Sequence, residues 1–195
     1  MTRLFIRTSI ALLTIAATTA SVAAPAPALV QAWGVDHGRS RLGFVAAMNG
    51  QAFNGLFRRW EAKIRFDPAH LDASSVQVLI DAGSATTGDQ TRDEALPTAD
   101  WFAAQSFPRA TFVSRHFVSL GGNRYRVDGD LKIRDTARPV SIPFQLQIQG
   151  PEARMAGRLS IDRTLFGVGQ GQFKGTDTVA AKVDVVINLS ASKLP

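Results

Sequence analysis

The segments YRVDGDLKI (residues 125–133) and VSIPFQLQIQ (residues 140–149) decide the fold. Apolar side chains alternate with polar ones along both, as where Val127 is followed by Asp128. Because successive side chains of a β-strand point to opposite faces, this alternation predicts strands with one apolar face and one polar face. The run Gly121-Gly122-Asn123 before the first segment indicates a hairpin turn.

The same alternation recurs along most of the chain. It predicts six further strands, over residues 42–48, 60–66, 76–82, 111–118, 155–161 and 179–189. About eight one-sided strands must bury their apolar faces, and antiparallel pairing achieves this burial. Closure into a barrel also removes exposed strand edges. The pattern therefore predicts an all-β protein with an antiparallel eight-stranded barrel, and a two-sheet sandwich is the alternative that alternation alone leaves open.

Turn and helix signals interrupt this pattern. Thr91-Arg92-Asp93-Glu94 fits a capping box and predicts a short helical insertion, which Pro97 ends. Pro143 has no amide donor, so we expect a bulge or light pairing at that point of its strand. The run Gly167-Val168-Gly169-Gln170-Gly171 lacks the spacing and the strand-to-helix setting of a nucleotide-binding loop. We interpret it as a flexible connection.

The N-terminal residues have the pattern of a secretory signal peptide. Arg3 and Arg7 accompany an apolar run over residues 10–20, and small residues follow at 21–24. A retained membrane anchor is the alternative, but the apolar run is short for a membrane span. We expect cleavage and a location in the bacterial periplasm, with secretion into the medium as the alternative.

Three regions follow from this interpretation. We predict a signal peptide over residues 1–23, a linker over 24–32 and one barrel domain over 33–195. A single domain agrees with the chain length of 195 residues.

Composition excludes several classes of protein. With 45% apolar and 19% charged residues, the chain is not mainly disordered. It contains no cysteine, which rules out disulfides, thiolate metal sites and cysteine nucleophiles. The formal charge of +6 falls to +4 once Arg3 and Arg7 leave with the signal peptide. The remaining basic residues are scattered, so we expect no nucleic-acid partner and at most peripheral contact with anionic membranes.

An ordered set of short motifs covers nearly all of the mature chain. In chain order these are Val35-Asp36, Ser40-x-Leu42-x-Phe44, Gly55-x-Phe57, Ile64-x-Phe66-Asp67, Ser84-x-x-Thr87-Gly88, Arg92-Asp93-x-x-Leu96, Trp101-Phe102, Phe107-Pro108-x-x-x-Phe112, Val127-x-Gly129-x-Leu131-x-Ile133, Thr136-x-x-Pro139-Val140 and Arg163-x-x-Phe166-Gly167. The set resembles the YceI-like family of bacterial periplasmic lipid-binding proteins. The resemblance implies an extended, lipocalin-like eight-stranded barrel whose hydrophobic tunnel holds a polyisoprenoid or similar long-chain lipid, with quinones and polyprenyl lipids as examples. It is also compatible with a homodimer.

The chain departs from the family pattern at two positions. Family members commonly have a histidine before the serine of the first strand and another after that strand, where this chain has Arg39 and Met48. No role of those histidines toward a headgroup or a metal is carried over. The replacement favours a more apolar pocket mouth or a different lipid.

The predicted binding site combines inward-facing strand residues with a group of aromatic residues near the helical insertion. The residues predicted to contact the lipid are Leu42, Phe44, Ala62, Ile64, Phe66, Ile80, Trp101, Phe102, Phe107, Phe112 and Leu131. Ordinary core packing is the competing interpretation for each aromatic residue. Arg92 and Asp93 are candidates for holding a headgroup or lining the mouth, and an ion pair that caps the helix is the alternative.

Catalytic signals are weak. His37, His70 and His116 are far apart and lack metal-ligand spacing, and there is no GxSxG motif. We therefore expect no catalytic residue, no metal and no cofactor, and predict a protein that stores, sequesters or transports a lipid. Two alternatives stay open: a periplasmic hydrolase or redox enzyme acting on a small substrate, and a structural or interaction protein with a filled barrel.

Overall fold

The computed structural model describes residues 30–195. The predicted signal peptide and residues 24–29 of the predicted linker lie outside the described residues. Strand β1 begins at Ala32, which is the last residue of that linker. Within residues 30–195, no helix combines the length and the apolar character needed to cross a membrane.

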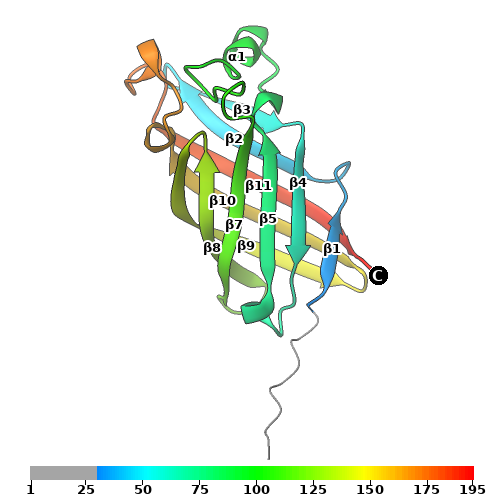
Figure 1. Cartoon of the computed structure of the whole chain (residues 1–195). Helices are drawn as coiled ribbons and strands as arrows, with labels where there is room; N and C mark the ends of the chain where they lie inside the picture. The colour runs from blue at the N-terminus through cyan, green and yellow to red at the C-terminus, as the bar shows by residue number, and fades with distance from the viewer. Residues whose placement is uncertain (1–29) are drawn as a thin grey trace, which may run out of the picture.

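The described chain forms one antiparallel sheet of eleven strands with a few short helices (Figure 1). The strands are β1 (Ala32–Val35), β2 (Arg41–Met48), β3 (Gln51–Phe57), β4 (Trp60–Arg65), β5 (Ser75–Asp81), β6 (Ala85–Thr86), β7 (Arg109–Ser119), β8 (Arg124–Ile133), β9 (Thr136–Gln149), β10 (Glu152–Asp162) and β11 (Lys182–Lys193). The helices are α1 (Gln90–Ala95) and the 3-10 turns η1 (Leu71–Ala73), η2 (Ala82–Ser84), η3 (Arg163–Phe166) and η4 (Gly171–Phe173).

The sheet closes on itself through β11. Strands β4, β5, β7, β8, β9, β10 and β11 are neighbours in that order. The first half of β11 then pairs with β2 and its last residues pair with β1, which in turn pairs with β4. Because β1 and β2 share one position in the ring, the closed structure is an eight-stranded barrel. The predicted barrel is confirmed, and the sandwich is wrong.

Strand β9 changes partner in its middle. It pairs with β8 from Thr136 to Gln145, but with β10 only from Phe144 onward. Pro143 therefore has a partner on one side only, which its missing amide donor permits. The light pairing predicted at this proline is confirmed.

Strands β1 and β3 were not predicted. β1 has only four residues, and β3 carries Gly55 where alternation would place an apolar side chain. A Cβ atom on Gly55 would lie 2.1 Å from Cζ of Phe44 on the paired strand β2. The glycine is therefore required by packing against Phe44, and the same glycine interrupts the sequence pattern.

The helical insertion is confirmed, but its predicted cap is wrong. Asp89 has an extended backbone, and its carboxylate accepts the amide of Arg92 at 3.0 Å. Helix α1 therefore begins at Gln90, and Thr91 lies within it rather than at the cap. The helix ends ahead of Pro97, as expected.

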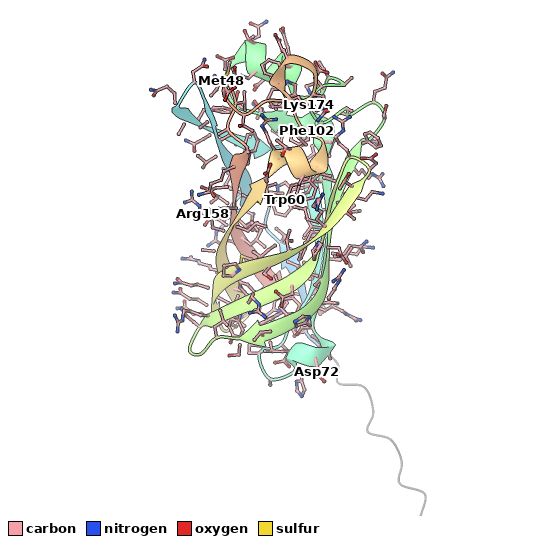
Figure 2. The ribbon with its side chains drawn as sticks, turned by 90° about the vertical axis from the view of Figure 1, so that its left-hand side faces the viewer. Met48, Trp60, Asp72, Phe102, Arg158 and Lys174 are labelled. Carbon is pink, nitrogen blue, oxygen red and sulfur yellow. The ribbon has the colours of Figure 1, made fainter. Side chains whose placement is uncertain are left out.

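Different loops cover the two ends of the barrel. Helix α1 lies at one end and η1 at the other, as Figure 1 shows and as the positions of Phe102 and Asp72 show in Figure 2. At the α1 end, Nη1 of Arg134 donates to the carbonyl oxygens of Trp101 and Gly167, both at 2.8 Å. One side chain thus ties the α1–β7 connection to the β10–β11 connection.

Candidate functional site

The barrel encloses a cavity of about 180 Å³. A water molecule needs about 10–15 Å³ on a comparable measure, so the cavity has room for roughly a dozen groups of that size. The interior is therefore hollow, in contrast to the filled barrel considered as an alternative.

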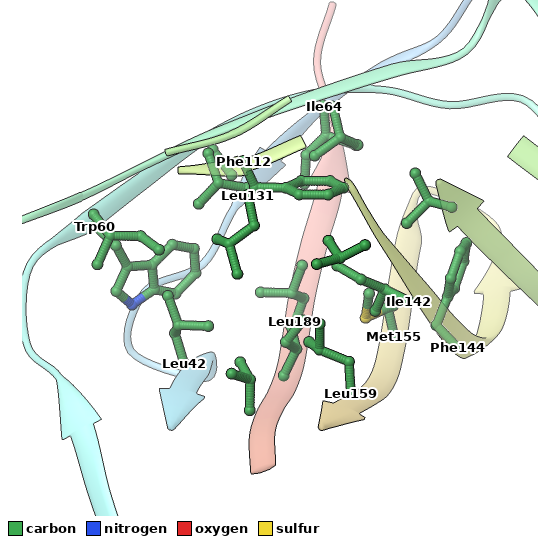
Figure 3. Close-up of a pocket in the computed structure, with 18 of the residues that line it drawn as sticks. Leu42, Trp60, Ile64, Phe112, Leu131, Ile142, Phe144, Met155, Leu159 and Leu189 are labelled. Atoms are coloured by element: carbon green, nitrogen blue, oxygen red, sulfur yellow. The ribbon is translucent and has the colours of Figure 1, made fainter. Parts of the chain in front are cut away.

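The cavity wall is made of apolar side chains from most strands of the barrel (Figure 3). Strand β4 illustrates the geometry, since Trp60, Ala62 and Ile64 all face the cavity, as does Phe66 just beyond the strand. At about 3.3 Å per residue, these positions span about 20 Å. The cavity is therefore elongated along the barrel.

Aromatic side chains stand at both ends of this cavity. Phe57 and Phe102 meet at the α1 end, with ring centroids 5.6 Å apart. At the η1 end, Phe66 packs against Phe117 at 5.3 Å and against Phe144 at 6.2 Å. These edge-on contacts are typical of well-packed aromatic clusters, and here they limit the length of the cavity.

Most of the predicted contact residues lie on the cavity wall. These are Leu42, Ala62, Ile64, Phe66, Ile80, Phe102, Phe112 and Leu131. Alternation placed all of them except Phe102 on inward faces, and barrel closure brings those faces around one space. Phe102 was predicted from the aromatic group near the helical insertion and lies between α1 and β7. Whether they contact a ligand stays a prediction.

Three predicted residues do not reach the cavity. Phe44 is buried with Ala46 and Ala85, and its ring lies over Gly55 of the paired strand β3. Trp101 lies 5.0 Å from the ring of Phe173, and Phe107 faces the guanidinium of Arg134 at 5.7 Å. Each of these rings packs against a loop or the neighbouring strand instead, which the sequence pattern did not reveal.

Several wall residues were missed by the prediction. Trp33 and Phe57 belong to the unpredicted strands β1 and β3, so no periodicity pointed to them. Trp60, Phe117 and Phe144 lie in or beside predicted strands. The alternation of β4 and β9 was the signal that could have identified Trp60 and Phe144.

Arg92 and Asp93 do not belong to the cavity wall. The guanidinium of Arg92 stacks over the ring of Phe53 at 4.7 Å. The carboxylate of Asp93 accepts hydrogen bonds from the Thr86 hydroxyl at 2.5 Å and the Thr87 amide at 2.6 Å. These hydrogen bonds, led by the one from Thr86, lower the pKa of Asp93 to about 2. The headgroup role of these two residues stays a prediction, and the alternative of an ion pair at the start of the helix agrees with the contact between Arg92 and the capping residue Asp89.

Asp93 instead anchors helix α1 to the end of β6. Its oxygens also accept from the Thr87 hydroxyl at 2.8 Å and from the Gly88 amide at 3.3 Å. Arg92 forms a long ion pair with Asp89, with 3.7 Å between Nη2 and Oδ2. These contacts fix the position of the insertion that covers one end of the barrel.

Arg163 organises the other loop at this end. Only 3% of it is exposed, and its guanidinium donates to six backbone carbonyls between residues 168 and 180. Its shortest contact is 2.7 Å, to the carbonyl of Val179. Burial lowers the pKa of Arg163, but a guanidinium stays charged at any ordinary pH. The glycine-rich segment 167–171 is thus held by one buried cation.

The two histidine–carboxylate pairs among residues 30–195 are both exposed. His116 Nε2 lies 2.8 Å from Asp128, and His70 Nδ1 lies 3.0 Å from Asp67. Ser141 donates to Asp128 rather than to His116, and this hydrogen bond is the main cause of the lowered pKa of Asp128. A serine nucleophile needs a base as its direct partner, so this arrangement is not a catalytic triad.

Comparisons with known proteins agree with the fold. The YceI-like domain family matches residues 33–191 of the chain. A UPF0312 protein of Vibrio cholerae is 29% identical over 120 residues, which cover 58% of this chain and 64% of that protein. A second UPF0312 protein of Vibrio cholerae is 33% identical over 88 residues, which cover 45% of this chain and 47% of that protein. The chain thus spans about half to two thirds of the length of these relatives.

Solved structures show the same architecture. The crystal structure of Burkholderia cenocepacia BcnA is 34% identical, with a TM-score of 0.79, and the match covers 82% of this chain and all of BcnA. A polyisoprenoid binding domain from Saccharophagus degradans is 14% identical with a TM-score of 0.66, and the match covers 84% of this chain and 99% of that domain. The second likeness concerns the fold alone. From the match over residues 33–191 and the shared barrel, the chain belongs to the YceI-like domain family.

Proposed function

We propose that this protein is an exported binding protein that holds the apolar chain of a polyisoprenoid or similar lipid inside its barrel. The observation that carries the proposal is the elongated cavity whose wall consists of apolar side chains. A polyisoprenoid binding domain with the same fold supports the ligand class. The signal-peptide pattern at residues 1–23 supports a periplasmic location.

The energetics of burial favour such a ligand. Each methylene moved from water into the barrel contributes about 0.8 kcal/mol, so roughly a dozen buried carbons contribute about 10 kcal/mol before the costs of association. A wall without charged groups would bury a phosphate or carboxylate at a large cost. The charged part of any amphipathic lipid must therefore remain outside the cavity.

A binding role also fits the groups at the site better than catalysis does. The wall residues carry no nucleophile, acid or base. Among residues 30–195, no group of three histidine or acidic side chains is placed to hold a metal ion. The relatives described above have no enzyme names. We therefore assign no reaction to this chain.

The test is to identify the ligand directly. The protein is purified from a bacterial periplasm without detergent, extracted with organic solvent, and the extract is analysed by mass spectrometry. We expect an isoprenoid or other long-chain lipid in stoichiometric amount. A protein that is repeatedly free of lipid, and that takes up no long-chain lipid from vesicles, contradicts the proposal.

A further inference from the structure

The barrel wall has a break between β9 and β10 at the α1 end. These strands pair only between residues 144–149 and 152–157, so residues 136–143 of β9 and 158–162 of β10 have no ladder between them. Each stretch keeps its partner on the other side, which is β8 for β9 and β11 for β10. Figure 2 shows the two strands diverging toward the α1 end. We call the two unpaired stretches the seam.

Two prolines keep the β9 side of the seam from pairing. The amide of Leu146 donates to the carbonyl of Asn123 at 2.9 Å, on the side of β8. Because the amides of a strand point alternately to its two edges, the odd-numbered residues in this part of β9 have their amide positions toward β10. Pro139 and Pro143 occupy two of the four such positions in the seam. Proline has no amide to donate, so this edge cannot form a regular ladder with β10.

Side-chain packing closes the seam instead. Ile142 of β9 and Leu159 of β10 belong to one buried core cluster together with Phe166 of η3. Within residues 30–195, no ladder and no side-chain hydrogen bond joins the two stretches directly. β9 is linked only to the segment beyond β10, where Nε of the exposed Arg138 donates to the carbonyl of Leu165 at 2.9 Å. Parting the seam therefore separates mainly apolar side chains.

The seam lies between the cavity and a hollow on the outer surface. Ile142 and Leu159 both line the cavity. Outside the barrel, Pro143 and Arg158 line a hollow of about 490 Å³ where the two strands begin to part. Phe144 borders both spaces. A separation of β9 from β10 would therefore connect the cavity with the surface.

Other closures of the wall depend on hydrogen bonds. A second break lies between β4 and the bend that joins β1 to β2, where His37 packs against Trp60. This bend is fixed to β11, because the Asp36 amide donates to the carbonyl of Ser190 at 2.9 Å and the Ser190 amide donates to the Ser40 hydroxyl at 3.0 Å. The loops at the α1 end are held by the arginine contacts described above. Opening the wall at the seam therefore breaks fewer hydrogen bonds than opening it at either of these places.

We infer that the seam is the route by which a ligand enters and leaves the cavity. β9 and β10 separate toward the α1 end, and their paired section acts as the hinge. This inference rests on the proposed function, because it supplies the route for a ligand that the cavity holds. An elongated ligand passes through the side of the barrel, so the loops that cover both ends stay in place.

Reversible cross-linking tests the route. The chain contains no cysteine, so introduced cysteines can be bridged selectively. Continuing the register of the paired section places Ser141 opposite Ser160, and both are exposed. In Ser141→Cys/Ser160→Cys, a bifunctional methanethiosulfonate bridges the seam, and a reducing agent removes the bridge. The control Gln145→Cys/Ala156→Cys bridges the same two strands at exposed positions that are already partners in their ladder.

The readout is the rate at which the cavity fills and empties. Energy transfer from Trp33 and Trp60, which both line the cavity, reports binding of cis-parinaric acid, a fluorescent long-chain fatty acid. We expect the bridge across the seam to slow uptake and release at least about tenfold, and reduction to restore both rates. The control bridge should change neither rate. Each variant is compared with itself before and after bridging, so any effect of the substitutions on stability cancels.

A second pair of variants tests the seam without a cross-link. Ile161 of β10 packs against the core cluster that closes the seam and does not line the cavity. Ile161→Ala should therefore raise the uptake and release rates together, by about threefold or more, with little change in affinity. Val183→Ala is the control, because Val183 is the partner of Ile161 in the β10–β11 ladder and does not line the cavity either. Both rates should stay unchanged in the control.

The outcomes separate this inference from the proposed function. If the protein binds the probe but the bridged seam leaves both rates unchanged, or the control bridge slows them equally, the ligand does not pass through the seam and the proposed function stands. Unchanged rates in Ile161→Ala, or equal increases in both alanine variants, would contradict the seam in the same way. If wild-type protein shows no energy transfer to the probe, the proposed function fails and the route fails with it.

Discussion

The ring of Phe112 on β7 occupies the space that a side chain at Gly129 on β8 would need. A Cβ atom on Gly129 would lie 2.7 Å from Cζ of Phe112 and 2.4 Å from the carbonyl oxygen of Val113. Gly129 lies two residues from the inward-facing Val127 and Leu131, which both line the cavity. The missing side chain therefore lets Phe112 lie flat against the wall.

Gly129→Ala should destabilise the barrel. The new methyl group must displace backbone as well as the ring of Phe112, and overpacking of this kind costs about 1–3 kcal/mol in the free energy of unfolding. Urea denaturation measures the loss. Gly175→Ala is the control, because a Cβ at Gly175 has no neighbour within 4 Å. Equal stability of both variants would contradict the packing described here.

Arg163→Lys should weaken the β10–β11 connection although it keeps the charge. A lysine offers three donors from one atom and cannot serve six carbonyls spread over residues 168–180. Leaving several buried carbonyls unpaired should lower the free energy of unfolding by about 3 kcal/mol. Amide hydrogen exchange should also become faster at residues 167–180. The exposed Arg154 provides the control substitution Arg154→Lys, which should change neither quantity.

Asp93→Asn should destabilise the protein in a pH-dependent way. The folded-state pKa of Asp93 is about 2, below its usual 3.8, and the largest cause is the hydrogen bond from the Thr86 hydroxyl. Because the pKa is depressed on folding, the carboxylate stabilises the fold above about pH 4 and this stabilisation is lost as pH falls toward 2. Midpoints of thermal unfolding across this range should show the variant below wild type at neutral pH and converging with it in acid. If the difference in unfolding midpoint between Asp93→Asn and wild type did not change with pH, Asp93 would not anchor helix α1 through its carboxylate. The same conclusion would follow if Asp177→Asn, at an exposed position, gave an equal difference.

Ala62→Trp should block ligand uptake without unfolding the barrel. Ala62 faces the cavity from β4, and an indole there would take up much of the 180 Å³. We expect the affinity for a fluorescent fatty probe to fall at least about tenfold. Ala156→Trp puts the same indole at an exposed position of β10 and should bind the probe normally. Full uptake by a folded Ala62→Trp variant would place the ligand elsewhere.

Affinity should depend on chain length until the cavity is full. Each added methylene should tighten binding about fourfold, from about 0.8 kcal/mol of burial. A cavity of 180 Å³ holds roughly a dozen small groups, so the gain should level off near that length. Competition with a fluorescent probe over a series of alkyl chains measures this. Affinities that do not vary with length would show binding outside the barrel.

The inward faces of the long strands could be predicted because alternation records them directly. Val140, Ile142 and Phe144 of β9 all line the cavity, as their spacing indicated. Strand β3 was not predicted, because Gly55 has no side chain at an inward position of the strand and the ring of Phe44 occupies that space. The capping residue was misplaced because Asp89 and Thr91 are both acceptable caps in sequence, and only the backbone conformation selects Asp89.

The sequence by itself determined which side chains face inward, because the side-chain period of a strand is local and needs no partner. Only the tertiary structure decided which of those side chains border empty space. Phe44, Trp101 and Phe107 are as apolar as Phe112, yet each packs against a hairpin or loop that folds back over it. Likewise, the indole N–H of Trp33 donates to the carbonyl of Phe66 at 2.9 Å, a partner 33 positions away in the sequence. Whether a side chain borders the cavity, and which acceptor an indole N–H finds, both depend on contacts between residues far apart in the chain. No local sequence pattern encodes such contacts.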